Sequence, residues 1–595
     1  MSQAKVKLDA QREKQVREAE ELLFAGPQKL GLAKGLFLGR FAADWVMPYP
    51  ALPPKEADTT ERAVTEVRQF LDESLDPAAI DRQSDIPREV VEGLGRLGVL
   101  GMTAPKEFGG RGFSQMAYCR VMEEIGGRCA STSIFTNAHH SIGIRALLLF
   151  GTPEQKRRWL PPLVRGEQLA AFALTEPEAG SDAANVQTQA VPSADGSHYV
   201  LNGEKRYITN GAIAQVLTVM ARTPIPGKSE TAVTAFLVTP DMPGFVAVEP
   251  RMEKLGLRGT ATARLAFRDM RVPKENILGP LGKGLKVALT VLDFGRTTFG
   301  ACCTGAAKTC LRLAVEHANT RKQFGRTLGE FELIKKKIAR MAAGAYALEA
   351  MTTVTASLID RGLEDYMLET AILKVFSTEA VWMLVNDAFQ VYGGAAYFTD
   401  RPLERMLRDA RINQIGEGAN EVLTSFIALV GMRAPGQQFQ ELQEALRHPW
   451  GEWRKAWLFG LDRLGSAVRA PSVPVRSRQL KPHAERLGEL IRRFSVEVNR
   501  ALIRHREAIL ERQYVQERIA RAAMELFASA CALSRWDAEL QAGAPEAKTD
   551  GAFHSAAELF LRGSFRRARR SLAEMHDNDD AAVTATADWV LKHGR

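Results

Sequence analysis

Cysteine is scarce in this sequence, and the spacing of the cysteines indicates neither a metal site nor a disulfide framework. The chain has 595 residues and six cysteines, at positions 119, 129, 302, 303, 310 and 531. No pair of them has the spacing of metal ligands, and the set does not form a disulfide framework. We therefore expect reduced thiols, a reducing compartment and no metal site.

Long apolar runs are also missing. No stretch reaches the about 20 apolar residues that a membrane-spanning helix needs. The first residues, MSQAKVKLDAQREKQ, mix acidic and basic side chains and lack the apolar core of a secretory signal. These absences predict a cytoplasmic protein, or one of the mitochondrial matrix if its source is eukaryotic.

Several common motifs are absent as well. There is no GxGxxG between a strand and a helix, no Walker A sequence and no GxSxG elbow. A Rossmann dehydrogenase, a P-loop nucleotidase and an α/β-hydrolase are therefore excluded. Helix-turn-helix, RNA-recognition and zinc-finger patterns are missing too, so we expect no nucleic-acid partner despite the net charge of +9.

The sequence does contain segments that differ in apolar periodicity and in composition. Apolar residues at helical spacing predict an α domain over 61–170 and a helical bundle over 283–432. Between them, short segments rich in Val, Ile, Thr and aromatic residues predict a β domain over 171–282. Residues 1–60 form an N-terminal extension, and 433–595 form a C-terminal helical extension. The predicted fold is therefore mainly α with a central β domain.

Five motifs carry side chains or backbone suited to chemistry. They are FALTEPEAGSDAANVQTQA (172–190), NGEKRYITNGA (202–212), HANTRKQFG (317–325), QVYGGAAY (390–397) and RDARINQIGEGANEV (408–422). Backbone amides and hydroxyls in the first motif suit a phosphate or the edge of a flavin. The last motif places Glu417 between two glycines, directly before a predicted helix. Taken singly, each motif is also compatible with an ordinary polar loop.

Together, in this order and at these separations, the motifs resemble the acyl-CoA dehydrogenase family. GLFLGRFAADWVMPYP (35–50), HHSIGIRALLLFGTPEQKRRWLPPL (139–163) and the long C-terminal extension resemble its very-long-chain subgroup. That subgroup also includes an assembly factor of respiratory complex I. The resemblance covers about residues 35–595 and implies an α domain, a β domain and a four-helix bundle, with FAD as the cofactor.

The resemblance implies that Glu417 is the catalytic base, which removes a proton from C2 of a fatty acyl thioester. It implies FAD contacts within one subunit by Phe172, Leu174, Thr175, Ser181, Tyr207, Thr209 and Asn420. It implies contacts to the FAD of a neighbouring subunit by Arg321, Gln323, Phe324, Gln390 and Gly394. Contacts to the acyl-CoA are implied for Ser181, Asp293, Arg296 and Gly418. From the residues alone, Asp293 and Arg296 would be surface charges of a helix.

Three positions depart from the family pattern. Tyr207 stands where the family usually has Trp, Gly416 where it usually has an aromatic residue, and Ala419 where it usually has Thr. The base itself is present. The expected function is FAD-dependent dehydrogenation of long-chain acyl-CoA, with electron-transferring flavoprotein as acceptor and a homodimer as the assembly. Two alternatives stay open, an acyl-CoA oxidase and a family member that acts as an assembly or scaffold protein.

The C-terminal quarter adds a membrane hypothesis. Residues 446–595 hold 26 Arg and Lys against 19 Asp and Glu. The segment 446–469 combines Trp450, Trp453 and Trp457 with basic residues at helical spacing, which is typical of a helix lying in a membrane interface. A core helix explains the pattern equally well from the residues alone. The resemblance favours peripheral attachment to the inner face of a membrane.

Overall fold

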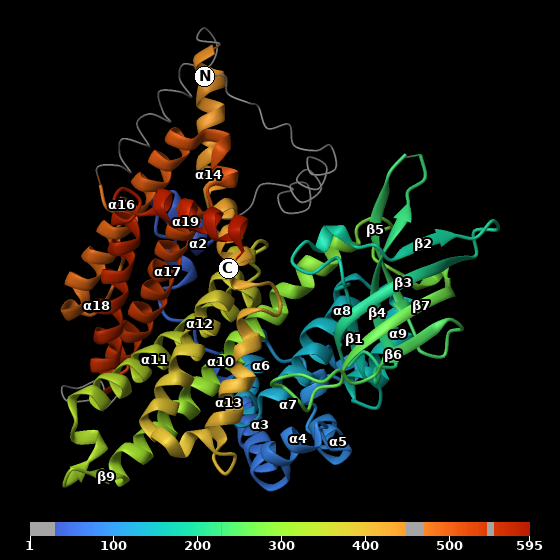
Figure 1. Ribbon diagram of the computed structural model, residues 1–595, viewed down its shortest axis with the longest axis horizontal. Coiled ribbons are helices and arrows are strands. Elements are labelled where there is room, and N and C mark those ends of the chain that lie inside the picture. Colours follow the sequence, from blue (N-terminus) through green and yellow to red (C-terminus); the bar gives the residue numbers. More distant parts are fainter. Residues whose placement is uncertain (1–29, 228, 448–468, 544–551, 595) are drawn as a thin grey trace. The chain divides into compact units, whose positions relative to one another are not determined.

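The computed structural model describes residues 30–227, 229–447, 469–543 and 552–594. These residues divide into two compact units, which are described separately. The first unit comprises residues 58–125 and 129–299, and the second comprises residues 30–57, 126–128 and 300–594. Figure 1 shows the helices and strands by label and colour.

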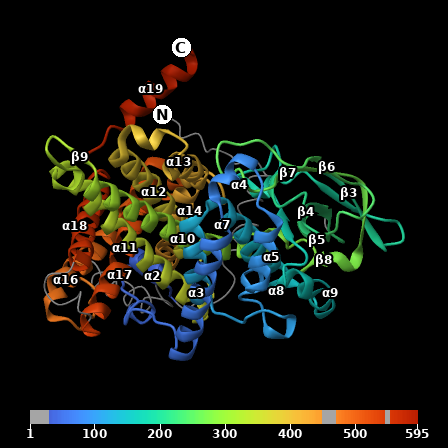
Figure 2. The same cartoon turned by 90° about the horizontal axis from the view of Figure 1, so that it is seen from below.

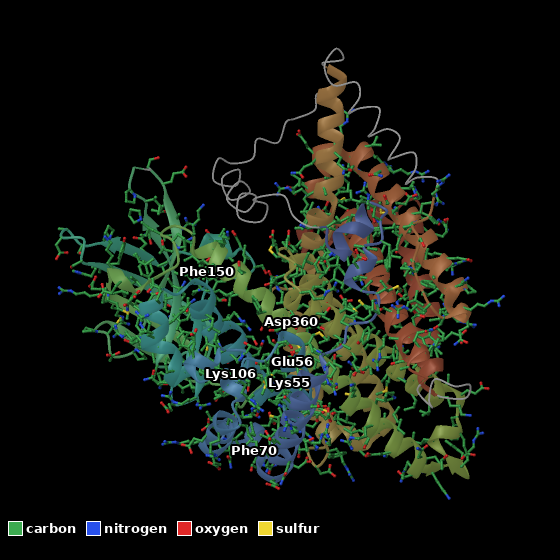
Figure 3. The ribbon with its side chains drawn as sticks, turned by 180° about the vertical axis from the view of Figure 1, so that it is seen from behind. Lys55, Glu56, Phe70, Lys106, Phe150 and Asp360 are labelled. Carbon is green, nitrogen blue, oxygen red and sulfur yellow. The ribbon has the colours of Figure 1, made fainter. Side chains whose placement is uncertain are left out.

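The first unit begins with helices joined by short turns. They are α3 (Pro54–Ser74), α4 (Pro77–Gln83), α5 (Arg88–Arg96), α6 (Gln115–Arg128), α7 (Ala130–Asn137), α8 (Arg145–Phe150) and α9 (Pro153–Val164). Local sequence sets their ends: Asp76 caps α4, and Thr152 and Gln155 form a capping box at α9. Phe70, labelled in Figure 3, packs directly on Gly93 of α5, where a Cβ would lie 2.2 Å from the ring.

A twisted, mostly antiparallel sheet follows in the first unit. Its strands run in the order β6-β7-β3-β2-β4-β5-β8, and β1 pairs with β4 in parallel. They are β1 (Ala170–Ala173), β2 (Gln189–Pro192), β3 (His198–Thr209), β4 (Val216–Pro224), β5 (Thr231–Val238), β6 (Phe245–Glu249), β7 (Thr262–Pro273) and β8 (Ile277–Leu278). The central strand β4 is buried along most of its length, which agrees with its nearly continuous apolar sequence.

In its described residues, the second unit is helical apart from one small hairpin and the connecting loops. After α10 (Gly284–Thr320), which begins in the first unit, come the hairpin strands β9 (Lys322–Gln323) and β10 (Arg326–Thr327). The remaining helices are α2 (Leu32–Phe37), α11 (Glu332–Asp360), α12 (Met367–Tyr392), α13 (Pro402–Arg411), α14 (Asn420–Arg447), α16 (Lys481–His505), α17 (Gln513–Gln541), α18 (Ala552–Ala573) and α19 (Asp580–His593).

The C-terminal helices share one core with the bundle. A single cluster of buried apolar side chains contains residues of α2, α11, α12, α14, α16, α17 and α18. In Figure 1 helices α17 and α18 lie beside α11, and both contact it. Helix α16 contacts α17 and α18. The extension therefore completes the apolar core of its unit.

The two ends of the described chain differ in how they join the second unit. The segment 30–57 is tied to the bundle by an ion pair between Lys34 and Asp365 and by Arg361, which donates to the carbonyl oxygen of Asp44. Figure 3 labels Asp360 at the end of α11. At the other end of the chain, every residue of α19 except the half-buried Asp580 is exposed, and Figure 2 shows this helix pointing away from its neighbours.

The predicted fold class is confirmed: helices, a central sheet, a helical bundle and a C-terminal helical extension occur in that order. The helix expected over 446–469 lies almost entirely outside the described residues, so its three tryptophans are not placed. Among the described helices, none is both long and apolar enough to cross a membrane.

Candidate active site

Glu417 lies on a tight loop directly before α14. Its φ is +55°, a left-handed conformation that residues other than glycine seldom adopt, and Gly418 follows with a φ of +100°. Such a conformation costs on the order of 1–3 kcal/mol and persists only where surrounding contacts hold it. Before the loop, the N–H of Gly416 donates to the carbonyl oxygen of Ile412 over 2.9 Å.

Lys374 holds the loop from the other side. This residue of α12 is fully buried, and its ammonium donates to the carbonyl oxygen of Gly418 over 2.7 Å and to Oδ1 of Asn420 over 2.8 Å. Asn420 in turn donates through Nδ2 to the hydroxyl of Thr378 over 3.1 Å. The amide of Asn420 is therefore engaged with α12, and its implied contact with the cofactor stays a prediction.

Gly416 has room for a larger side chain. A Cβ built at this position would meet only the carbonyl oxygen of Ile412, at 3.7 Å, within a 4 Å radius. By contrast, a Cβ on Gly418 would contact Leu423 at 3.2 Å, and its φ is unsuited to other residues. Glycine is thus required at 418, whereas backbone and space within the structure do not require it at 416.

Another group of predicted residues gathers on the sheet of the first unit. The pairing of β3 with β7 shifts between Lys205 and Ile208, and at this bulge Tyr207 adopts a φ of +62° with 58% of its surface exposed. The N–H of Arg206 donates to the carbonyl oxygen of Thr175 over 2.9 Å, which brings Thr175 beside the bulge. Bulges commonly redirect a side chain toward a functional site.

The neighbouring side chains suit a flat, partly polar ligand. Thr175 and Thr209 are half-buried, and their hydroxyls form no hydrogen bond with the described residues. Phe172 and Leu174 are half-buried and pack against the apolar core of this unit, whereas Ser181 is exposed on the loop that follows. The sheet therefore presents one aromatic ring and two available hydroxyls close to the end of β1.

A buried ion pair fixes the loop that carries Thr175 and Ser181. The ammonium of Lys205, which is fully buried, donates to Glu176 over 2.6 Å and to the carbonyl oxygen of Leu174 over 3.1 Å. Burial would raise the pKa of Glu176, but Lys205 and hydrogen bonds from Thr188 and Gln187 lower it. Burial lowers the pKa of Lys205 to about 8, although the charge of Glu176 opposes that shift.

The third group lies on the surface of the second unit. Phe324 and Gly325 have φ values of +52° and +80°, as in a type I′ hairpin turn between β9 and β10, and Phe324 is 93% exposed. Arg321, Gln323, Gln390 and Gly394 are exposed as well.

One ring contact connects the parts of this surface. His317, one turn before Arg321 on α10, stacks on Tyr392 of α12 with ring centroids 4.1 Å apart. Tyr392 lies two residues after Gln390 and two before Gly394. Burial, followed by the charges of Arg321 and Arg401, lowers the pKa of His317. The structure thus brings the end of α10, which precedes Arg321, beside the end of α12, which carries Gln390.

Asp293 and Arg296 are not surface charges, which corrects the interpretation from the residues alone. Both are buried in α10, 2% and 7% exposed, and form an ion pair at 3.2 Å. Their implied contact with CoA stays a prediction, and this burial does not favour it.

Sequence reasoning missed the two lysines that hold the site loops. Lys374 interrupts the apolar helical run AILKVF, and Lys205 occupies an inward position of a strand. A lone lysine inside an apolar periodic pattern is the signal that would have identified Lys374, because such a residue is buried only where hydrogen bonds compensate its charge.

Four family models match the chain in succession. They are the N-terminal domain of acyl-CoA dehydrogenase at residues 57–167, the middle domain at 171–270, the C-terminal domain at 282–431 and the "ACAD9/ACADV, C-terminal domain" at 478–594.

Individual relatives agree with these models. The human mitochondrial very long-chain specific acyl-CoA dehydrogenase is 37% identical, over 88% of this chain and 81% of its own. The probable acyl-CoA dehydrogenase FadE10 of Mycobacterium tuberculosis is 34% identical, over 96% and 90%. The crystal structure of an acyl-CoA dehydrogenase complexed with FAD from Bacillus anthracis superposes with a TM-score of 0.78 at 28% identity, covering 93% and 94% of the two chains. The chain therefore belongs to the acyl-CoA dehydrogenase family.

Proposed function

We propose that the protein catalyses the FAD-dependent α,β-dehydrogenation of long-chain fatty acyl-CoA to trans-2-enoyl-CoA, the first step of fatty acid β-oxidation. The observation that carries this proposal is the carboxylate of Glu417, held in a left-handed conformation between two glycines at the start of α14. A strained acidic residue whose loop is anchored on both sides suits a positioned general base.

The residues present fit FAD. The available hydroxyls of Thr175 and Thr209 and the exposed ring of Tyr207 match a flavin ring with polar edges. Exposed Arg321 offers a planar fork of donors suited to a pyrophosphate. When bound, FAD supplies the acceptor for the hydride that leaves C3 of the substrate. The chain's own part is to bind and orient both molecules and to take a proton.

Glu417 takes that proton from C2 of the acyl group. The C2–H becomes acidic enough only when the thioester oxygen is stabilised as negative charge develops on it. The backbone N–H of Glu417 supplies a donor for this oxygen, by resemblance to the family. The glycines beside Glu417 leave the backbone uncovered, so a thioester is able to approach the main chain.

Partners follow from the same proposal. An exposed surface that carries Phe324, Arg321 and Gln390 suits coverage by a second copy of this chain, whose FAD these residues would contact. Electron-transferring flavoprotein is the proposed electron acceptor. The proposal includes a cytoplasmic or matrix location and peripheral contact with the inner face of a membrane through the segment 446–469.

Anaerobic mixing with acyl-CoAs of increasing chain length tests the function. The purified protein should be yellow, and saturated long-chain acyl-CoA should bleach its flavin absorbance, while the enoyl product forms in equal amount. Rapid formation of H2O2 in air would instead support the oxidase alternative. A colourless protein that gains no thermal stability from added FAD would support the scaffold alternative. The residues that keep this alternative open are Gly416 and Ala419, where the sequence departs from the family pattern.

A further inference from the structure

Lys374 occupies a position where a charge is costly. It lies in the first half of α12, between the buried residues Leu373 and Val375, and none of its own surface is exposed. An ammonium in such surroundings is tolerated only when hydrogen bonds replace its hydration. One such bond goes to the carbonyl oxygen of Gly418 in the loop before α14, and another to Oδ1 of Asn420, the first residue of α14.

These bonds fix the backbone on the C-terminal side of Glu417. On its N-terminal side, Gly416 donates to Ile412, so the peptide groups 415–416 and 418–419, one residue to either side of Glu417, are held. The φ of +55° at Glu417 is unfavourable for a residue with a side chain. Loss of either anchor would let this residue relax to a more common conformation and turn its carboxylate.

The same lysine also fixes the first residue of α14. Asn420 accepts from Lys374 and donates to Thr378, and the Thr378 hydroxyl donates to the carbonyl oxygen of Lys374 over 2.9 Å. These three residues, with the main-chain carbonyl group of Lys374, close a ring of hydrogen bonds between α12 and α14. The loop of Glu417 and the start of the helix that follows it therefore share one anchor.

The charges of Lys374 and Glu417 act on one buried side chain. Cys303 of α10 is buried, and burial raises its pKa to about 12, while Ser377 and Lys374 lower it and Glu417 raises it. Both charges are therefore close enough to Cys303 to act on its pKa, in opposite directions.

We infer that Lys374 is a positioning residue for the base: its ammonium holds the loop 415–419 so that Glu417 keeps the left-handed conformation that presents its carboxylate. This inference rests on the proposed role of Glu417. Lys374 touches neither substrate nor cofactor in this role; it acts on the reaction only through the loop.

Two substitutions test the inference in the full-length holoenzyme. Lys374→Met keeps the length and volume of the side chain but removes all its donors. Lys374→Gln removes the charge and keeps two N–H donors, so it should restore part of the loop's support. Lys308→Met is the control, because Lys308 also lies on a helix of this unit and pairs with Glu349 of α11 at 3.0 Å.

Hydrogen exchange of the purified proteins without substrate measures the loop directly. In Lys374→Met the amides of residues 416–423 should exchange about tenfold faster or more, because the loop opens without global unfolding. Lys374→Gln should lie between this variant and the wild type, and Lys308→Met should match the wild type. If no acyl-CoA reduces the wild-type flavin, the proposed function is rejected. The exchange rates would still show whether Lys374 holds the loop.

Rapid-mixing kinetics separate proton abstraction from binding. Flavin reduction in Lys374→Met should slow by about 10- to 100-fold, the range expected for a misplaced catalytic group, while acyl-CoA affinity and FAD content change little. A folded variant with wild-type exchange in this loop, or with wild-type reduction, overturns the inference. If Lys374→Met fails to fold, Thr378→Val is measured instead, because it removes the hydroxyl that holds Asn420. Wild-type exchange in the loop, or wild-type flavin reduction, in this variant would likewise overturn the inference.

Discussion

Three predicted site residues share a backbone conformation that side chains seldom adopt. Tyr207, Phe324 and Glu417 have φ values of +62°, +52° and +55°. Aromatic and acidic side chains make this conformation costly, and such strain gathers at functional sites. Only at Phe324 and Glu417 does a following glycine in the sequence hint at it, so the strain itself was not predictable from residue types.

Glu417→Gln is the most direct test of the base. Glutamine keeps the size of the side chain but cannot take a proton, so flavin reduction by acyl-CoA should slow by about 10²-fold or more. Binding of FAD and acyl-CoA should persist, because neither needs the negative charge. Stopped-flow bleaching under anaerobic conditions measures the rate. Glu421→Gln, four residues on and exposed, is the control; equal rates in wild type and Glu417→Gln would assign the base to another residue.

Arg321→Ala tests the proposed pyrophosphate contact. The wild type should purify with one FAD per chain. Removal of the guanidinium leaves phosphate charge uncompensated, so the variant should lose FAD on gel filtration and regain it at high FAD concentration. Flavin absorbance per chain measures the loss. Lys322→Ala, exposed on the same hairpin, should retain its FAD, and full retention in Arg321→Ala would remove this residue from the site.

Helix α12 connects the site with the rest of its unit. It carries Lys374 toward the loop of Glu417, Tyr392 toward His317, and Glu369 toward the start of α2. Apolar periodicity predicted a helix here, because most of its residues face a core. The polar contacts were not predictable, since they depend on which helices meet, and periodicity contains no information on neighbours.

Glu369 should make stability depend on pH. It is fully buried, and its Oε1 accepts the N–H of Ala33 over 3.0 Å. Burial raises its pKa to about 7; the charge of Asp365 adds to the shift, and Lys34 and the Ala33 hydrogen bond oppose it. An unfolded glutamate has a pKa of about 4.3, so between these values the folded protein binds one proton more than the unfolded chain. Its contribution to stability is present at low pH and is lost as pH rises toward 7.

Glu369→Gln should remove this dependence. The variant should match the wild type near pH 5 and exceed its free energy of unfolding by about 2–3 kcal/mol above pH 7. Denaturant unfolding at a series of pH values measures both. Glu364→Gln, an exposed carboxylate on the same segment, should show no such difference between the two pH values. An unchanged pH profile in Glu369→Gln would mean that Glu369 is ionised in the folded protein.

For the whole chain, recognition of the family from motif order was confirmed, and the fold class with it. The order of helical and β segments is visible in the sequence because helices and strands differ in the period of their apolar residues. What the sequence did not reveal is that the C-terminal extension shares one core with the bundle. Helical periodicity shows that a face is apolar and leaves open which helix covers it.

Removal of the extension should therefore expose core. A chain that stops after Met432 would uncover apolar side chains of α11, α12 and α14 that α16, α17 and α18 bury in the full chain. Large exposed apolar surfaces drive association, so this truncated protein should aggregate or form larger oligomers than the full chain. Size-exclusion chromatography and thermal unfolding test this outcome. A soluble truncated protein with the full chain's assembly and melting temperature would contradict a shared core.

The two buried lysines also give each unit its own internal reporter of unfolding. Lys205 lies in the first unit and Lys374 in the second, and neither exposes any surface. Amine-reactive reagents, including reactive acyl thioesters, will modify surface lysines of the native protein and spare these two. Modification of Lys205 or Lys374 then marks molecules in which that particular unit has opened. Pulsed amine labelling with peptide mass spectrometry will thus follow the two units independently within one intact chain.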